Sequence, residues 1–228
     1  VFCATGRRPI QIAGLKVKDL YETDKYKFKD EKKVHVLNIP KAKIRGASGF
    51  RYAFREVGIR ESIVQILFEH TRILKQKLSK EIKRELSEQE FAELPLFYDF
   101  EKLANLDWEN RHEISEILPK EIIHLPTAEL TQILKGAVRK LGVRSRETGK
   151  PIFVTSYRFR YTLGTNAARQ KAGVIVIANL LDHHDTQNAH CYVQSVPEIA
   201  QQISSIMDES LRKYADAFQG KVVKDEIE

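Results

Sequence analysis

Hydrophobic and polar residues alternate in two stretches near the start of the chain. The residues "KVHVLNIP" (33–40) and "FRYAFREV" (50–57) have the period of two that is typical of a half-buried β-strand. Between them lies a basic stretch that contains glycine, which indicates a turn. The pattern therefore predicts a β-hairpin whose tip carries Lys41, Lys43 and Arg45.

Helical spacing predicts two elements around this hairpin. Residues 5–20 predict a short helix that ends near Gly14 and is followed by an extended segment. Residues 60–78 have apolar side chains at helical spacing, namely Ile63, Ile66, Leu67, Ile73, Leu74 and Leu78.

Two further helices are predicted near the end of the chain. Residues 126–143 indicate a helix capped by Thr127, with Glu129 in its first turn, where the helix dipole favours an anion. The basic loop "RSRETGK" follows, and residues 157–173 predict the second helix. The apolar stretch "VIVIANLL" (174–181) fits either a buried strand or a helix, because periodicity does not separate the two.

Composition and charge add information about size and partners. The chain has 228 residues, 42% of them apolar, which suits one large domain or a domain with an insertion. Its formal net charge is +7, which favours a polyanionic partner. Two cysteines suit a reducing compartment, and the longest apolar run is too short to span a membrane.

One segment departs from this basic character. Residues 81–118 hold eleven acidic and four basic side chains, a net charge of −7, so the remainder of the chain is +14. The segment also carries five aromatic residues. We interpret it as part of a folded insertion (76–126) that faces away from any polyanion and has a small core of its own, made by Phe91, Phe97, Tyr98, Phe100 and Trp108.

The stretch "LLDHHDTQNAHCY" (180–192) is rich in metal-ligand residue types, including His183, His184 and His190. Helical zinc sites use ligands three or four residues apart, and this spacing does not occur here. Phosphodiester chemistry is the alternative, and it needs a nucleophile, an acid and cations that stabilise charge on the phosphate oxygens. Arginine suits the last role, but spacing alone does not choose among the many arginines.

The order of four motifs resembles the catalytic domain of a tyrosine recombinase, the phage-integrase type of site-specific recombinase. "ATGRRPIQIAGLKVKDL" resembles the first motif of this family and places one catalytic arginine at Arg8, with Leu15 and Asp19 as structural companions. "IPKAKIRG" resembles the hairpin tip that carries the catalytic lysine, best matched by Lys43, with Lys41 as the alternative.

The other two motifs lie in the last third of the chain. "YRFRYTLGTNAARQ" resembles the second motif and places Tyr157 and the second arginine, Arg160. "LLDHHDTQNAHCY" resembles the last motif and places the histidine at His183 and the nucleophile at Tyr192, nine residues later.

The resemblance implies a mostly α-helical fold with a small antiparallel sheet, without a metal ion or other cofactor. By analogy, Tyr192 attacks the scissile phosphate, which is held by Arg8, Arg160 and His183, and Lys43 protonates the leaving 5′ oxygen. The product is a 3′-phosphotyrosyl intermediate. Implied partners are double-stranded DNA and other copies of the chain, as a tetramer, with no membrane or small-molecule substrate.

The resemblance also implies a place in a larger protein. Residues 1–228 would form the C-terminal catalytic domain, preceded by a DNA-binding domain, in the prokaryotic cytoplasm. An amphipathic pattern after Val196 predicts a C-terminal helix.

Three positions depart from the family pattern: Gln11 replaces a usual Glu, Tyr157 a usual His or Lys, and Asp182 a usual Gly. They motivate two alternatives, a DNA-binding module of the same fold that does not cleave DNA, and a type IB topoisomerase-like enzyme.

Overall fold

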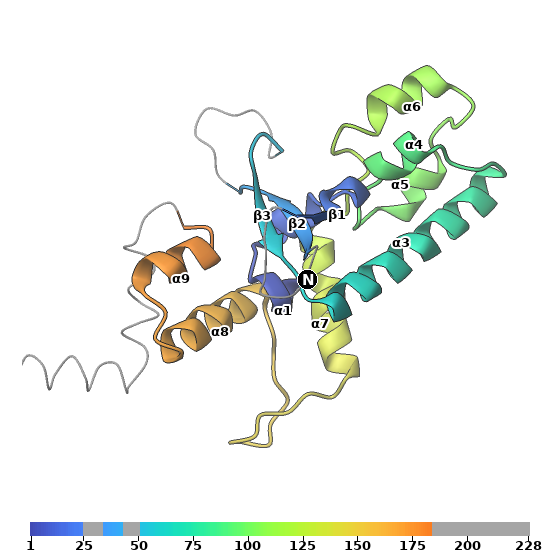
Figure 1. Cartoon of the computed structure of the whole chain (residues 1–228). Helices are drawn as coiled ribbons and strands as arrows, with labels where there is room; N and C mark the ends of the chain where they lie inside the picture. Colours follow the sequence, from blue (N-terminus) through green and yellow to red (C-terminus); the bar gives the residue numbers. More distant parts are fainter. Residues whose placement is uncertain (25–33, 43–50, 184–228) are drawn as a thin grey trace, which may run out of the picture. The chain divides into compact units, whose positions relative to one another are not determined.

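The computed structural model describes residues 1–24, 34–42 and 51–183 of the chain. The chain divides into two compact units, Val1–Arg160 and Tyr161–Glu228. A three-stranded sheet and most of the described helices belong to the first unit (Figure 1).

The first unit begins with two short helices, α1 (Phe2–Thr5) and α2 (Pro9–Ala13). Gly6 ends α1 with a φ of 58°, a left-handed conformation that glycine adopts at little cost. Pro9 opens α2, where its missing N–H is not needed. The predicted helix end near Gly14 is confirmed, and a 3₁₀ turn, η1 (Val17–Asp19), follows.

The sheet contains β1 (Leu20–Thr23), β2 (Val34–Pro40) and β3 (Phe54–Gly58) in that spatial order, with both pairs antiparallel. The central strand β2 is the most apolar and the most buried. The two strands of the predicted hairpin are therefore confirmed. Lys43 and Arg45, predicted at its tip, lie outside the described residues.

Helix α3 (Glu61–Ile82) joins two hydrophobic clusters. Its buried residues are spaced alternately three and four apart: Val64, Leu67, Thr71, Leu74 and Leu78. Leu67 packs in the cluster under the sheet, whereas Leu74 and Leu78 pack in the second cluster. Ile66 and Ile73 share the predicted helical pattern but lie beside this stripe, and their side chains are 65% and 48% exposed.

The acidic segment, residues 81–118, folds as α4 (Glu88–Glu93), α5 (Phe100–Ala104) and α6 (Arg111–Ile117) against the far end of α3 (Figure 1). Trp108 is buried in its centre, and the indole Nε1–H donates a hydrogen bond to Leu103 O at 2.9 Å. The predicted small core is thus present, completed by Leu74 and Leu78 of α3. Two of the five predicted aromatic residues are exceptions: Phe97 packs on the cluster under the sheet, and the Phe100 ring lies 3.6 Å from the Lys77 ammonium group outside the small core.

A short antiparallel contact attaches the acidic segment to the residues that follow α2. Val17 N–H donates to Leu94 O at 2.9 Å, and Leu96 N–H donates to Leu15 O at 2.8 Å. Between these bonds Lys16 is buried, and its ammonium group donates to Glu93 Oε2 (2.8 Å) and to two backbone carbonyls, those of Leu118 (2.8 Å) and Pro119 (2.9 Å). This buried cation therefore links the end of α4 and the last residue of the segment to the residues that follow α2.

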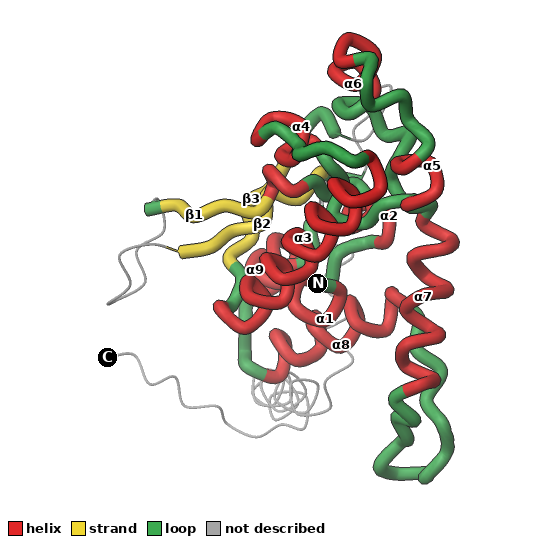
Figure 2. Tube along the Cα trace, turned by 90° about the vertical axis from the view of Figure 1, so that its right-hand side faces the viewer, coloured by secondary structure: helices red, strands yellow, loops and turns green. Residues whose placement is uncertain are grey.

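Helix α7 (Thr127–Lys140) ends in a hairpin that extends beyond it, as both views of the chain show (Figure 1, Figure 2). The prediction of Thr127 as the cap was wrong: Pro126 is the N-cap and Thr127 is the first helical residue, because the chain becomes helical directly after proline. Glu129 lies in the first turn, as predicted.

Helix α8 (Ser156–Arg169) confirms the last predicted long helix and runs from the first unit into the second. In the second unit the stretch that sequence left open is helical, α9 (Val174–Leu180). Small residues allow α8 and α9 to pack around a compact cluster of Ala168, Ile177, Ala178 and Leu181.

Candidate functional site

Arg8 is held at the start of α2 by the side chain of Gln11. The Arg8 backbone N–H donates to Gln11 Oε1 at 3.1 Å, and Gln11 Nε2 donates to Pro40 O at 2.9 Å. An amide can accept at one atom and donate at the other, whereas a carboxylate only accepts. The departure from Glu at this buried position therefore has a structural reason: it ties the first motif to the end of β2, three residues before Lys43.

Arg160, the last residue of the first unit in sequence, contacts the turn that precedes Arg8. Its side chain is 4% exposed, and Nη1 donates to Gly6 O at 3.0 Å. Gly6 precedes Arg8 by two residues, and its left-handed conformation makes the turn between α1 and α2. Two arginines that are far apart in sequence are thus anchored on one short loop.

The residues around this loop are fixed by buried charge. Arg51 forms a two-pronged ion pair with Asp19, with Nη1–Oδ2 and Nη2–Oδ1 distances of 2.7 and 3.0 Å, and also donates to Gly14 O. Asp19 in turn accepts from Lys16 N–H at 2.7 Å, and Leu15 is fully buried. Both proposed companions of Arg8 therefore have structural roles.

Burial, together with the nearby cations Lys16 and Arg51, lowers the pKa of His124 to about 4. His124 is therefore neutral at pH 7, and its Nδ1 donates a hydrogen bond to Ala13 O at 2.7 Å.

The remaining predicted site residues belong to other parts of the chain. Tyr157 lies three residues before Arg160 on α8, and its side chain is 63% exposed. Lys41 follows β2, and its backbone N–H donates to Ala53 O at 2.8 Å. Lys43 and Tyr192 lie outside the described residues. His183 belongs to the second unit and is half-buried.

Asp182, which precedes His183, has a φ of 54°. This left-handed conformation costs glycine least, and Asp and Asn tolerate it better than most other residues. The backbone therefore explains why the last motif usually has Gly here. It also explains how Asp can replace Gly without a change of turn.

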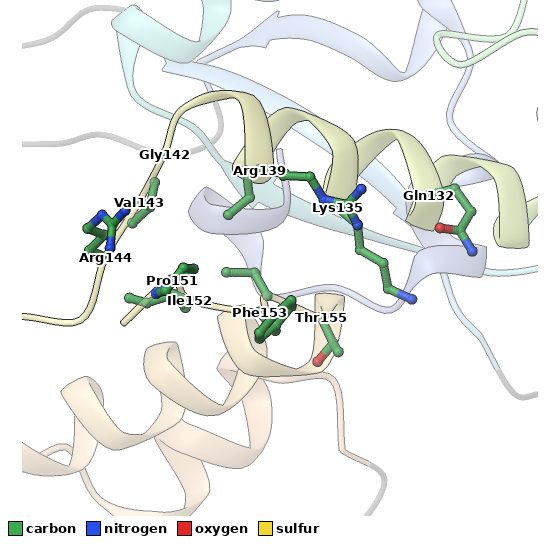
Figure 3. Close-up of a pocket in the computed structure, with 12 residues that line it drawn as sticks. Gln132, Lys135, Arg139, Gly142, Val143, Arg144, Pro151, Ile152, Phe153 and Thr155 are labelled. Carbon is green, nitrogen blue, oxygen red and sulfur yellow. The ribbon is translucent and has the colours of Figure 1, made fainter. Parts of the chain in front are cut away.

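A groove of about 600 Å³ lies between α7 and the segment that leads into α8. Figure 3 shows its two walls, with Lys135 and Arg139 from the helix, and Arg144 and Phe153 from the hairpin and the segment after it. The sequence reasoning marked residues 144–150 as a basic loop but missed this groove. A local charge count was an available signal, because residues 135–150 hold six basic side chains and one acidic side chain.

Within the described residues no group of three His, Cys, Asp or Glu side chains is arranged to hold a metal ion, and the cluster at His184, His190 and Cys191 lies outside them. No described helix is long and apolar enough to cross a membrane.

No protein-family model matches the chain, and no curated protein sequence matches it significantly. Solved structures do match. One is the XerH site-specific recombinase bound to its palindromic difH substrate in a post-cleavage complex, with a TM-score of 0.53 and 15% identity over 91% of this chain. Another is the XerA recombinase, with a TM-score of 0.49 and 16% identity over 91% of this chain.

The match to XerH defines the class of fold. A mostly helical chain with a small three-stranded antiparallel sheet, aligned over nine-tenths of its length with XerH, has the fold of a tyrosine recombinase catalytic domain. The chain covers 44% of the XerH chain and 54% of the XerA chain, so it spans about half the length of the solved structures it matches.

Proposed function

We propose that the chain is the catalytic domain of a site-specific recombinase that cleaves and rejoins double-stranded DNA. The observation that supports this most is the anchoring of Arg160 on the loop that precedes Arg8, with an Nη1–O distance of 3.0 Å to Gly6. Each of the two arginines was identified from a different motif. The Arg160 side chain bonds to the turn that leads into Arg8, and a phosphate site built from paired guanidinium groups needs two arginines held at one place in this way.

In the proposed reaction the phenolic oxygen of Tyr192 releases its proton to solvent and attacks the scissile phosphorus. The P–O5′ bond breaks and a 3′-phosphotyrosyl bond forms. Arg8, Arg160 and His183 stabilise charge on the non-bridging oxygens, and Lys43 gives a proton to the departing 5′ oxygen. Attack by a 5′ hydroxyl of a partner strand reverses the step, so the bond energy is conserved. Tyr157, three residues before Arg160 on α8, would donate a hydrogen bond to the phosphate.

The experiment uses sheared genomic DNA from the source organism. Covalent protein–DNA adducts are captured after denaturation, and the DNA bound in them is sequenced. A duplex of the recovered sequence is then made with a nick close to the cleavage point, so that the short strand released by cleavage diffuses away and the covalent adduct accumulates. The wild-type chain should form an adduct that survives a denaturing gel. Arg8→Ala and Arg160→Ala should each slow its formation by roughly 10²–10³-fold, the usual cost of removing one donor to a developing oxyanion.

Tyr192→Phe should abolish the adduct. Tyr98→Phe is the matched control, because it removes the same hydroxyl from a residue of the acidic segment and should leave the yield unchanged. DNA binding without any adduct would favour the module that does not cleave. Relaxation of supercoiled DNA by an isolated monomer would favour the topoisomerase-like enzyme.

A further inference from the structure

We infer that residues 135–150, named here the basic arm, bind the phosphodiester backbone of duplex DNA beside the cleavage site. The arm consists of the second half of α7 and the hairpin after it. The inference rests on the proposed function, which gives duplex DNA as the partner. It adds a second DNA-contact surface to the proposed phosphate site.

The arm has the charge of a polyanion-binding surface. Its six cations are all exposed, and its net charge is +5: Lys135, Arg139, Lys140, Arg144, Arg146 and Lys150, with Glu147 as the acid. None of the six forms an ion pair in the described part of the chain. Concentrating unpaired cations on one protrusion costs electrostatic self-repulsion, which an approaching row of phosphates relieves.

The hairpin of the arm is ordered by its own hydrogen bonds. Ser145 N–H donates to Lys150 O at 2.9 Å, Ile152 N–H donates to Val143 O at 3.0 Å, and the Arg144 guanidinium donates to Gly149 O at 3.0 Å. Gly142 and Gly149 provide the positive φ angles that the turn requires. The hairpin is therefore ordered before DNA binds, so binding costs less conformational entropy than it would for a flexible loop.

The cations of the arm also border the groove described above. Lys135, Arg139 and Arg144 come from both of its walls (Figure 3). Charged groups on two sides of a concave surface act on the same phosphates, and a concave surface concentrates their field.

The arm is close to the proposed phosphate site along the chain. Pro151 ends the hairpin, and α8 begins at Ser156. Five extended residues span at most about 17 Å, and the rise along α8 to Arg160 adds about 6 Å. Arg146, near the tip of the hairpin, is five residues farther along the chain and adds at most about 17 Å. With about 3.4 Å per base pair, the phosphates that the hairpin contacts lie within about twelve base pairs of the scissile phosphate.

The test compares two triple variants of the full chain on a 30-base-pair duplex of arbitrary sequence. Arg144→Gln, Arg146→Gln and Lys150→Gln remove three cations from the arm. Lys80→Gln, Lys102→Gln and Lys120→Gln remove three exposed lysines near or within the acidic segment. The dissociation constant is measured by fluorescence anisotropy over a series of salt concentrations.

The arm variant should lower the magnitude of the slope of log K against log salt by about 2–3, and weaken binding about 100-fold at 0.1 M salt. The control variant should leave both quantities unchanged. Equal slopes for wild type and arm variant would overturn the inference while adduct formation still supports the proposed function. If wild type forms no adduct but its salt slope still depends on the arm, the proposed function fails and the inference about the arm stands. If wild type binds no duplex at all, both the proposed function and the inference fail.

A second measurement locates the contact on the nicked duplex recovered by adduct capture. Single phosphates are replaced by neutral methylphosphonates, one position at a time. Replacements that weaken binding of wild type but not of the arm variant should fall within about twelve base pairs of the cleavage point. Positions farther away, or equal effects on both proteins, would contradict the proposed placement.

Discussion

The acidic segment (81–118) and the basic arm (135–150) use charge in opposite ways. In the acidic segment, ion pairs have structural roles: Arg84 binds Glu90 with two bonds of 3.0 and 2.6 Å, and buried Lys16 binds Glu93. In the basic arm none of the cations is paired within the described residues. The acidic segment gains folding stability from its charges, whereas the arm leaves its charges available to a partner.

This difference predicts that substitutions of charged residues separate into two groups. Changes in the acidic segment and its attachment should lower the free energy of unfolding. Changes in the arm should lower affinity for DNA and leave unfolding almost unchanged. The following measurements test this division, from the largest expected effect on stability to the smallest.

Lys16→Ala should destabilise the chain by about 3–5 kcal/mol. It removes a buried cation and leaves Glu93 and two carbonyl groups without their partner. Urea unfolding followed by Trp108 fluorescence reports on the acidic segment directly, because the indole lies in its core. Lys18→Ala is the control: Lys18 binds the same carboxylate but is 45% exposed, and its loss should cost less than about 1 kcal/mol. Equal costs would show that burial is not what makes Lys16 important.

Acid should destabilise the fold through His124, whose imidazole bonds to Ala13 O at the end of α2. The folded state holds the pKa of this imidazole at about 4, below the ordinary value of 6.5, so between these values the unfolded chain binds a proton that the folded chain does not. Stability is fully present above pH 6.5 and falls as the pH drops to about 4, by up to about 3 kcal/mol. His124→Gln should flatten this part of the pH–stability curve. His112→Gln, at an exposed histidine, should leave the curve unchanged.

Glu90→Gln should cost about 1–2 kcal/mol at pH 7, because it removes the charge from a two-pronged pair with Arg84 and keeps the size of the side chain. The Arg84 hydrogen bonds and the Ser87 N–H lower the pKa of Glu90 to about 2. Since a lowered carboxyl pKa stabilises the fold above the ordinary value of 4.5, the cost of the substitution should shrink as the pH falls from 4.5 towards 2. A cost that does not change with pH over this interval would contradict the role of the ion pair.

The arm variant with Arg144→Gln, Arg146→Gln and Lys150→Gln should unfold within about 0.5 kcal/mol of wild type, since exposed charges away from ion pairs contribute little. Thermal and urea unfolding measure this difference. A loss above about 1.5 kcal/mol would assign these cations a structural role, as in the acidic segment, and the contrast between the two regions would disappear.

Sequence predicted the elements whose patterns are local. The alternation in 33–40 and 50–57, the helix that ends near Gly14 and the long helices near 60–78 and 157–173 all follow from side-chain period and turn residues. Ile66 and Ile73 were less predictable, because the neighbouring positions Val64, Leu67 and Thr71 decide which stripe of α3 faces the core, and that choice depends on tertiary contacts. Residues 174–181 had no usable period, and the helix was set by packing with α8.

For the candidate site, sequence identified residues but not their connections. Motif order placed Arg8 and Arg160, whereas the turn at Gly6 that joins them depends on a contact between distant parts of the chain. The bond from Gln11 to Pro40 could not be foreseen for the same reason. The roles of Lys43, Tyr157, His183 and Tyr192 stay predictions, and the adduct experiment tests them.

The bond between Arg160 and Gly6 spans 154 positions in the sequence. A ribosome adds about 5–20 residues each second, so Gly6 emerges roughly 8–30 s before Arg160 can reach it. Throughout that interval the nascent chain contains Arg8 but not Arg160. The two halves of the proposed phosphate site therefore come together only late in synthesis, and a translation product that stops before α8 would lack the second half.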